Sequence, residues 1–297
     1  MKTDDEVWID GYERWKATYL SALFAGALFD QVLLPEVAAG VDWTGRVRYT
    51  PFARAGRSAA SDQLVLWGDA EARQAEFGRL RSLHRDVHGV SPEGVRFSAL
   101  APEAWNWILI STMFMYLNSY AAVSSRKPSA AELQVLWTHG LEQFEGLQLT
   151  GSQRLPEKYA EAVDYYDEMI RTKARRTEIF GHVTGQLRQP VAPAVPAILR
   201  PALGLVGRVV IRPVAVLSIG ITHPGVREIA GHRWTRRHQI EFSIYAALVR
   251  VAYQRLPRRL VFTPLAYNRW RYHRIVARYQ GAGLDSFAPE GSCPIVH

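Results

Sequence analysis

The chain has 297 residues, of which 48% are hydrophobic, 11% aromatic and 22% charged, and its formal net charge is +8. This composition excludes intrinsic disorder, and the length suits one large domain or two small ones. Cys293 is the only cysteine. An internal disulfide and a multi-cysteine metal or iron–sulfur site are therefore excluded, and a cytoplasmic location is expected.

The basic side chains are concentrated in the second part of the sequence. Residues 169–297 carry 20 basic and 5 acidic side chains, a net charge of +15, whereas residues 1–168 have a net charge of −7. Almost all of these later basic residues are arginines, which favour planar anions such as carboxylates and phosphates. The asymmetry is compatible with an anionic cofactor, a nucleic acid or an anionic membrane surface.

Apolar residues recur at steps of three and four residues in several segments, which predicts a helix in each. In chain order these segments are 7–28, 64–89, 102–122, 130–147, 156–180 and 236–256. The proline-flanked runs at 209–211 and 214–219 are interpreted as broken helix. The sequence therefore predicts an all-α fold, with a single helical domain over 1–280, a Pro-rich break near 186–196 and an irregular tail at 281–297.

The uncharged stretch 104–125 is long enough to cross a bilayer, but asparagine, serine and threonine interrupt it. We interpret it as a buried core helix and expect no transmembrane segment. The acidic start of the chain argues against a signal peptide.

Residues 76–89, EFGRLRSLHRDVHG, place a histidine on the apolar stripe of a predicted helix. At 100° per residue, His84 falls within about 20° of Phe77 and so points toward the core, with Arg81 and His88 at the edge of the stripe. An inward histidine can ligate haem iron, and neighbouring cations can bind the propionates. A core histidine bonded to a backbone carbonyl produces the same pattern.

His84 and His88 are also spaced as an i, i+4 pair, which can bind zinc when both lie on one helix. Position 85 is an arginine instead of the glutamate of the HExxH motif. A zinc or non-haem iron enzyme would therefore need a carboxylate from elsewhere in the chain, and it remains an alternative.

Three hydrogen-bond donors lie close together in residues 51–61, PFARAGRSAAS. Arg54, Arg57 and Ser58 fall at i, i+3 and i+4, so they share a face if the segment is helical. Such donors over an iron centre can orient dioxygen, or they can hold a carboxylate substrate. A solvated basic patch is the simpler alternative.

These segments belong to a longer series of short motifs. In chain order the series reads Arg54-x-x-x-Ser58, Trp67-Gly68, Arg81-x-x-His84-x-x-x-His88-Gly89, Pro102-Glu103-x-Trp105-x-Trp107, Leu155-Pro156 and Leu256-Pro257-x-Arg259. With this order the sequence resembles the latex-clearing protein (rubber oxygenase) family, which includes the fungal oxygenase that cleaves the farnesyl chain in mycophenolic acid biosynthesis. The resemblance covers roughly residues 17–260, by the motif positions.

The resemblance implies a globin-like haem b domain in which His84 is the iron ligand, flanked by Arg81 and His88. It also implies that Arg54, Arg57 and Ser58 either lie on the distal side of the haem or support the residues that do. The family usually has arginine at the position of His88 and threonine at that of Ser58, and often His-Pro where this chain has Leu34-Pro35. The distal acid–base residue is therefore not assigned.

The function expected from this resemblance is that of a haem b-dependent oxygenase with dioxygen or peroxide as the oxidant. Its expected substrate is a hydrophobic small molecule of specialised metabolism, oxidised by C=C cleavage or at a C–H bond. The alternative is a nucleic-acid or anionic-membrane binder that uses 232–238 and 268–274, where arginines alternate with aromatic residues. No specific nucleic-acid partner is expected, and no pattern indicates an oligomeric state.

Overall fold

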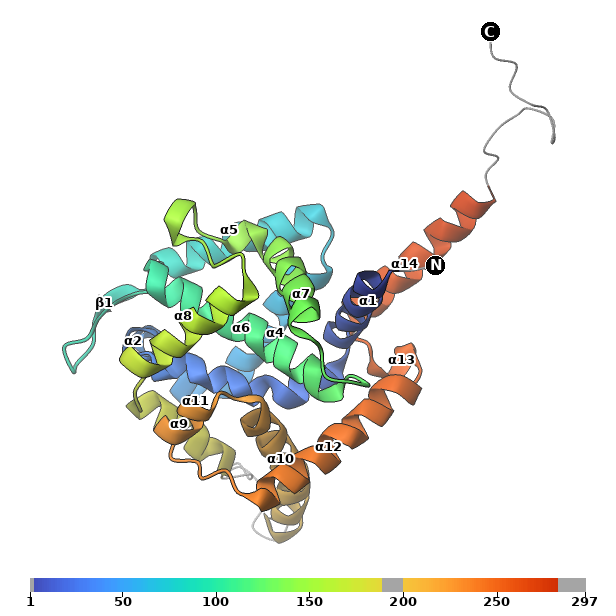
Figure 1. Cartoon of the computed structure of the whole chain (residues 1–297). Coiled ribbons are helices and arrows are strands. Elements are labelled where there is room, and N and C mark those ends of the chain that lie inside the picture. Colours follow the sequence, from blue (N-terminus) through green and yellow to red (C-terminus); the bar gives the residue numbers. More distant parts are fainter. Residues whose placement is uncertain (1–2, 189–199, 283–297) are drawn as a thin grey trace, which may run out of the picture.

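A computed structural model describes residues 3–188 and 200–282, which form an array of helices with one short strand hairpin (Figure 1). The prediction of an all-α fold is confirmed. In chain order the elements are α1 (Asp4–Lys16), the 3-10 helix η1 (Tyr19–Leu33), α2 (Pro35–Trp43), α3 (Arg46–Tyr49), α4 (Pro51–Trp67), α5 (Ala70–Arg85), β1 (His88–Val90), β2 (Arg96–Ser98), α6 (Pro102–Val123), α7 (Ala130–Gln143), η2 (Glu145–Leu147), η3 (Gly151–Gln153), α8 (Tyr159–Thr172), α9 (Glu178–Arg188), α10 (Arg200–Ile221), α11 (Pro224–Ile229), α12 (Arg236–Arg255), α13 (Arg258–Val261) and α14 (Pro264–Gly281).

Several predicted helix boundaries are wrong. The predicted helices 7–28, 64–89 and 156–180 are each divided in two, and the run predicted to be broken helix lies inside the continuous helix α10, which contains Pro213. Helix α9 ends at Arg188, within the predicted Pro-rich break near 186–196, and the rest of that break lies outside the described residues. Residues 283–297, with Cys293, also lie outside them.

Helix starts follow the rules of capping. Thr3, Ser129 and Thr235 each accept a hydrogen bond from the third residue of the helix that follows, and the side chain at that position bonds back to the cap. Proline occupies the first turn of α2, α4, α6 and α14, where its missing N–H costs no hydrogen bond.

Helix α6 forms the centre of the core. Its side chains are buried around almost its whole circumference, and Trp107, Ile110, Met113 and Leu117 are among the largest fully buried side chains. It contacts η1, α7, α8 and α12, so protein surrounds it as expected for a core helix. Among the described residues, no single helix has both the length and the apolarity to cross a membrane, although η1 and α2 together, bent by 107°, meet both criteria.

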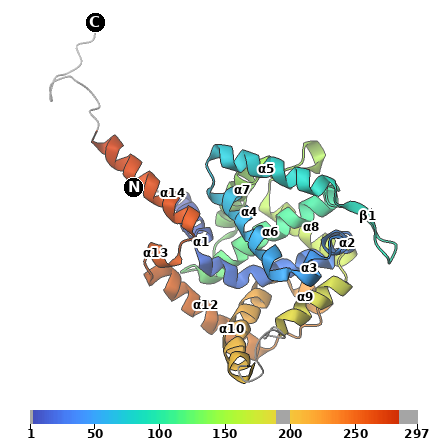
Figure 2. The same ribbon diagram turned by 180° about the vertical axis from the view of Figure 1, so that it is seen from behind.

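The beginning of the chain packs against its last helices. Thr18 forms a β-bridge with Phe262, and the Thr263 N–H donates to the Ala17 carbonyl at 2.9 Å. The Tyr253 hydroxyl donates to the Gly11 carbonyl at 2.8 Å. Both ribbon views accordingly show α1 beside α13 and the start of α14 (Figures 1 and 2).

Gly146 in η2 allows close contact with α5, and its replacement tests that contact. A Cβ at this position would lie 1.9 Å from Cδ2 of the buried Phe77 ring, so the ring or the backbone must move. We expect Gly146→Ala to lower the free energy of unfolding by about 1–3 kcal/mol in urea denaturation. Gly78→Ala, beside Phe77 but with open space around its Cβ, should be neutral or stabilising. Equal losses in the two variants would contradict this explanation.

Candidate functional site

Helices α4 and α5 form an antiparallel hairpin joined by Gly68 and Asp69. The Asp69 carboxylate accepts from the Ala72 N–H at 2.8 Å and so starts α5. On the outside of the turn, the Arg269 guanidinium of α14 donates to the Trp67 and Gly68 carbonyls at 3.3 and 2.5 Å. From this fixed turn the two helices diverge, as both ribbon views show (Figures 1 and 2).

One hydrogen bond sets the register of the hairpin. The Ser61 hydroxyl of α4 donates to the buried Glu76 carboxylate of α5, which also pairs with Arg79. Arg54 lies beyond Ser61 on α4, and His84 lies beyond Glu76 on α5, so both are farther from the turn than this bond. The two residue clusters predicted from sequence therefore lie on the two helices of one hairpin, away from its turn.

The His84 ring has a defined orientation. Its Nδ1 lies 2.7 Å from the Leu80 carbonyl, and its ring meets the edge of Trp105 at 90° with 5.5 Å between centroids. A carbonyl oxygen only accepts, so Nδ1 carries the hydrogen and the neutral ring has its lone pair on Nε2. Among the described residues Nε2 has no hydrogen-bond partner. This is the arrangement of a metal-binding histidine oriented through its other nitrogen.

The segment after α7 contacts both α5 and the Trp105 ring of α6 that packs on His84. The Trp105 indole N–H donates to the Leu147 carbonyl at 2.6 Å, and the Arg81 guanidinium donates to the Gln148 carbonyl at 3.4 Å. The His84 side chain is half-buried and Arg81 is exposed, so His84 is less deeply buried than a core position would be. Its side chain is packed on one side and accessible on the other.

The structure does not place His88 on the same helix as His84. Helix α5 ends at Arg85, and His88 opens strand β1, where it pairs with Ser98 and is exposed. The prediction of a helical i, i+4 histidine pair is therefore wrong, because the chain leaves the helix before the second histidine. In the part of the chain that the structure describes, no group of three or more histidine, cysteine, aspartate or glutamate residues could hold a metal ion.

The predicted donor cluster lies on one helix. Arg54, Arg57 and Ser58 are all in α4, which confirms the helical segment on which their shared face depends. Arg54 is half-buried, whereas Arg57 and Ser58 are exposed. Burial, followed by the nearby Arg57 guanidinium, lowers the pKa of Arg54. A bound anion or an oxygen acceptor would stabilise these two guanidinium groups, because it would offset their mutual repulsion.

A family comparison agrees with these motifs. The family described as "ER-bound oxygenase mpaB/B'/Rubber oxygenase, catalytic domain" matches residues 13–251, from α1 through most of α12. The chain belongs to this family. It is an oxygenase catalytic domain and therefore an oxidoreductase, as the resemblance implied. Searches of curated proteins and of solved structures found no significant match.

Within this oxygenase domain, one further residue of α4 was not identified from sequence. Asp62 follows Ser58 by one turn, so Arg54, Ser58 and Asp62 share a helix face at i, i+4 and i+8. Burial, followed by the neighbouring Glu76 carboxylate, raises the pKa of Asp62 to about 7. The helical spacing was visible in the sequence, but the burial that changes its acidity depends on tertiary contacts.

Several arginines of the oxygenase's basic part have intramolecular partners. Arg258 and Arg274 both stack on Trp270 at 4.8 Å, and Arg212 and Arg237 both pair with Glu241. The segment 232–238 leads into α12, and 268–274 lies within α14. Aromatic stacking and ion pairs within the chain therefore account for part of the alternation of arginine and aromatic residues.

Proposed function

We propose that this chain is a haem b-dependent oxygenase that oxidises a hydrophobic small molecule with dioxygen or peroxide. The observation that supports haem most directly is the His84 ring, whose Nδ1 is bonded to a carbonyl and whose Nε2 is free for iron. Bound haem supplies the redox-active iron that activates the oxidant. Side chains of α4, α5 and β1 would bind the haem and orient the oxidant.

The chemistry of the donor set fits a dianionic porphyrin. His84 provides one neutral nitrogen ligand from α5, and Arg81 and His88 provide exposed donors near the same end of that helix. Arginine and histidinium donors suit propionate carboxylates, which need charge-assisted hydrogen bonds at the protein surface. In this proposal His88 binds a propionate from strand β1, whereas His84 binds the iron from helix α5.

In this proposal, residues of α4 lie on the side of the haem opposite His84. Arg54 would hold a donor toward the reacting oxygen, where developing negative charge needs stabilisation, and Ser58 would add a weaker neutral donor. Asp62, with a pKa near neutrality, is suited to exchange a proton at the pH of the cell. We propose Asp62 for the acid–base role, which the sequence left open, because it shares the α4 face of Arg54 and Ser58 as well as having this raised pKa.

The proposed substrate is an apolar molecule with C=C or activated C–H bonds, such as a polyisoprenoid or a natural-product intermediate. The description of the chain's family includes rubber oxygenase, and this supports an apolar substrate of that class. Non-covalent haem is expected because Cys293, the only cysteine, cannot form a C-x-x-C-H attachment motif.

Absorption spectroscopy tests this function. The protein is expressed with a haem precursor, purified and examined for a Soret band, and the pyridine haemochrome identifies haem b. Colourless protein that also acquires no Soret band when hemin is added would refute the haem proposal. Consumption of dioxygen or of peroxide by the loaded protein, with a polyisoprenoid as substrate, then distinguishes the two oxidants.

Arg54→Ala should slow the reaction but leave haem bound. Loss of one donor to developing charge costs about 3 kcal/mol, so we expect kcat to fall on the order of a hundredfold. Ser58→Ala should cost less, and Arg85→Ala, an exposed arginine at the end of α5, should be neutral. Haem content per chain is measured alongside turnover. Loss of haem in Arg54→Ala would instead make Arg54 a propionate anchor.

A further inference from the structure

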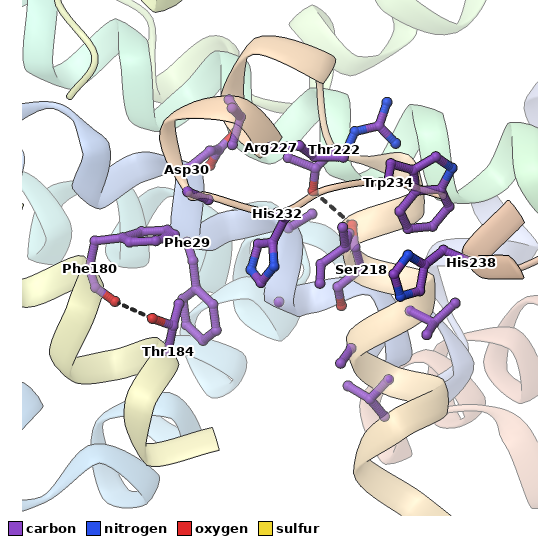
Figure 3. A pocket seen from close by; sticks show the side chains of 18 of the residues that line it. Phe29, Asp30, Phe180, Thr184, Ser218, Thr222, Arg227, His232, Trp234 and His238 are labelled. Atoms are coloured by element: carbon purple, nitrogen blue, oxygen red, sulfur yellow. Dashed lines mark hydrogen bonds between the residues drawn. The ribbon is translucent and has the colours of Figure 1, made fainter. Parts of the chain in front are cut away.

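A second site lies on the other side of η1. A cavity of about 660 Å³, open to solvent, is lined by residues of η1, α9, α10, α11 and the start of α12 (Figure 3). This volume is typical of sites for small molecules. None of its lining residues belongs to α4 or α5, so it is separate from the candidate oxygenase site.

The interior of this cavity is apolar. Phe29 of η1 and Phe180 of α9 form one side, and α10 contributes Ile211 and Ile219 to the wall. In Figure 3 Phe29 and Phe180 lie on one side and Ser218, Trp234 and His238 on the other, with the His232 ring between them. The hydroxyl of Ser218 donates to the Leu23 carbonyl, so it adds little polarity to the wall. An apolar chain would displace water from these surfaces at a gain in free energy.

We call the part of the cavity wall that carries the half-buried Arg227 and the exposed Arg233 its mouth, and this part is cationic. Arg227 of α11 and Arg233 of the following loop both line it, and the Arg227 guanidinium lies 5.0 Å from the centre of the Trp234 ring. Within the described residues, neither arginine makes an ion pair. Arg212 also lines the cavity, but its ion pair with Glu241 already neutralises its charge, so it is less suited to bind an anionic ligand. Two unpaired guanidinium groups beside an apolar interior favour a ligand that has an anionic head.

A buried carboxyl group lies in the inner wall. Asp30 is only 5% exposed, and its Oδ2 accepts from the Tyr166 hydroxyl. Its Oδ1 is buried and makes no hydrogen bond within the described residues, although the Gln31 amide lies nearby. A carboxyl group in the inner wall offers no positive charge to an anionic head, so the head is expected beside the arginines.

We propose that this cavity binds an amphipathic anion, with its apolar chain between Phe29 and Phe180 and its carboxylate or phosphate at Arg227 and Arg233. The ligand is a long-chain acid or a prenyl-type phosphate, since both combine an apolar chain with an anionic head. The inference does not rest on the proposed haem chemistry, because no residue of the candidate oxygenase site takes part in it.

Competition binding with the purified full-length chain tests the proposal. Dansyl-labelled undecanoate serves as the fluorescent probe, and oleate, farnesyl phosphate and oleyl alcohol are the competitors. We expect at least one anion to displace the probe about tenfold more effectively than the alcohol, and the better anion identifies the head group. Equal displacement by all three, or none by any, would overturn the proposal.

Variants of the mouth locate the head group. Arg227→Gln with Arg233→Gln should weaken binding of the preferred anion about tenfold and change that of oleyl alcohol less than about twofold. Arg236→Gln is the matched control, because it is an exposed arginine three residues from Arg233 that does not line the cavity. An equal loss in Arg236→Gln, or no loss in the double variant, would contradict a specific head-group site.

A variant of the interior locates the apolar chain. Ala215 of α10 lines the cavity and is half-buried, so Ala215→Phe should reduce the affinity of every competitor and of the probe. Far-ultraviolet circular dichroism and a melting curve establish that this variant is folded. Unchanged binding in folded Ala215→Phe would place the ligand elsewhere. A chain that lacks haem but passes these tests would refute only the proposed function.

Discussion

Replacement of His84 by alanine is expected to abolish the haem binding that we propose for this oxygenase. The substitution deletes the one nitrogen that the Leu80 carbonyl and the Trp105 ring orient. Loss of an outer-shell partner alone typically costs 10–100-fold in metal affinity, so loss of the ligand itself should cost more than about a hundredfold. Haem content after purification and hemin titration of the apoprotein measure the effect.

Two further variants make this experiment specific. His273→Ala removes an exposed histidine of α14 and should leave haem content unchanged. His84→Gly opens space for free imidazole, which should restore the Soret band if the histidine acts as a ligand and not only as a packing residue. Normal haem content in His84→Ala would place the ligand on another residue, and His88 would be tested next.

The second large effect concerns Asp30 and the pH dependence of stability. Burial raises the pKa of Asp30 from 3.8 to about 7, against smaller opposing effects of the Tyr166 hydroxyl and the Gln31 amide. Between these pH values the folded chain keeps a proton that the unfolded chain has lost, so stability decreases as pH rises. One pKa unit corresponds to 1.36 kcal/mol, which gives a loss on the order of 4 kcal/mol from Asp30.

Asp30→Asn should remove this contribution. Urea denaturation measures the free energy of unfolding at pH 5 and at pH 8. From pH 5 to pH 8 this free energy should decrease less in Asp30→Asn than in the wild type. Asp62 titrates in the same direction, so part of the pH dependence will remain. Asp86→Asn, at the exposed end of α5, is the control and should retain the full pH dependence. Identical decreases in wild type and Asp30→Asn would show that Asp30 is ionised in the folded protein.

The sequence predicted the helical class well because amphipathic periodicity is a local property. The sequence also predicted that Arg54 and His84 lie on helices, since this depends on local spacing, while their roles stay predictions. It did not reveal that the helix predicted over 64–89 is interrupted at Gly68, because apolar residues continue at helical spacing on both sides of the turn. Asp69, a good helix cap, was the available signal for a new helix at that point.

Features that depend on distant segments could not be predicted. Strand β1, which carries His88, exists through its pairing with β2, and a three-residue strand has too few positions to show alternation. The raised pKa of Asp62 depends on burial and on Glu76 across the hairpin. The second cavity combines side chains from η1 to α12, so no local pattern in the sequence indicates it.

The contact between the two ends of the chain has a consequence for folding. Helix α1 bonds to Tyr253, and the segment after it pairs with Phe262, so these contacts close loops of roughly 240 residues. Contacts so distant in sequence form slowly, and on a ribosome their partners are made last. Helix α1, which is synthesised well before these partners, should therefore be among the last of the described helices to pack. Until then its apolar face, with Trp8, Tyr12 and Trp15, is a surface that a chaperone can bind.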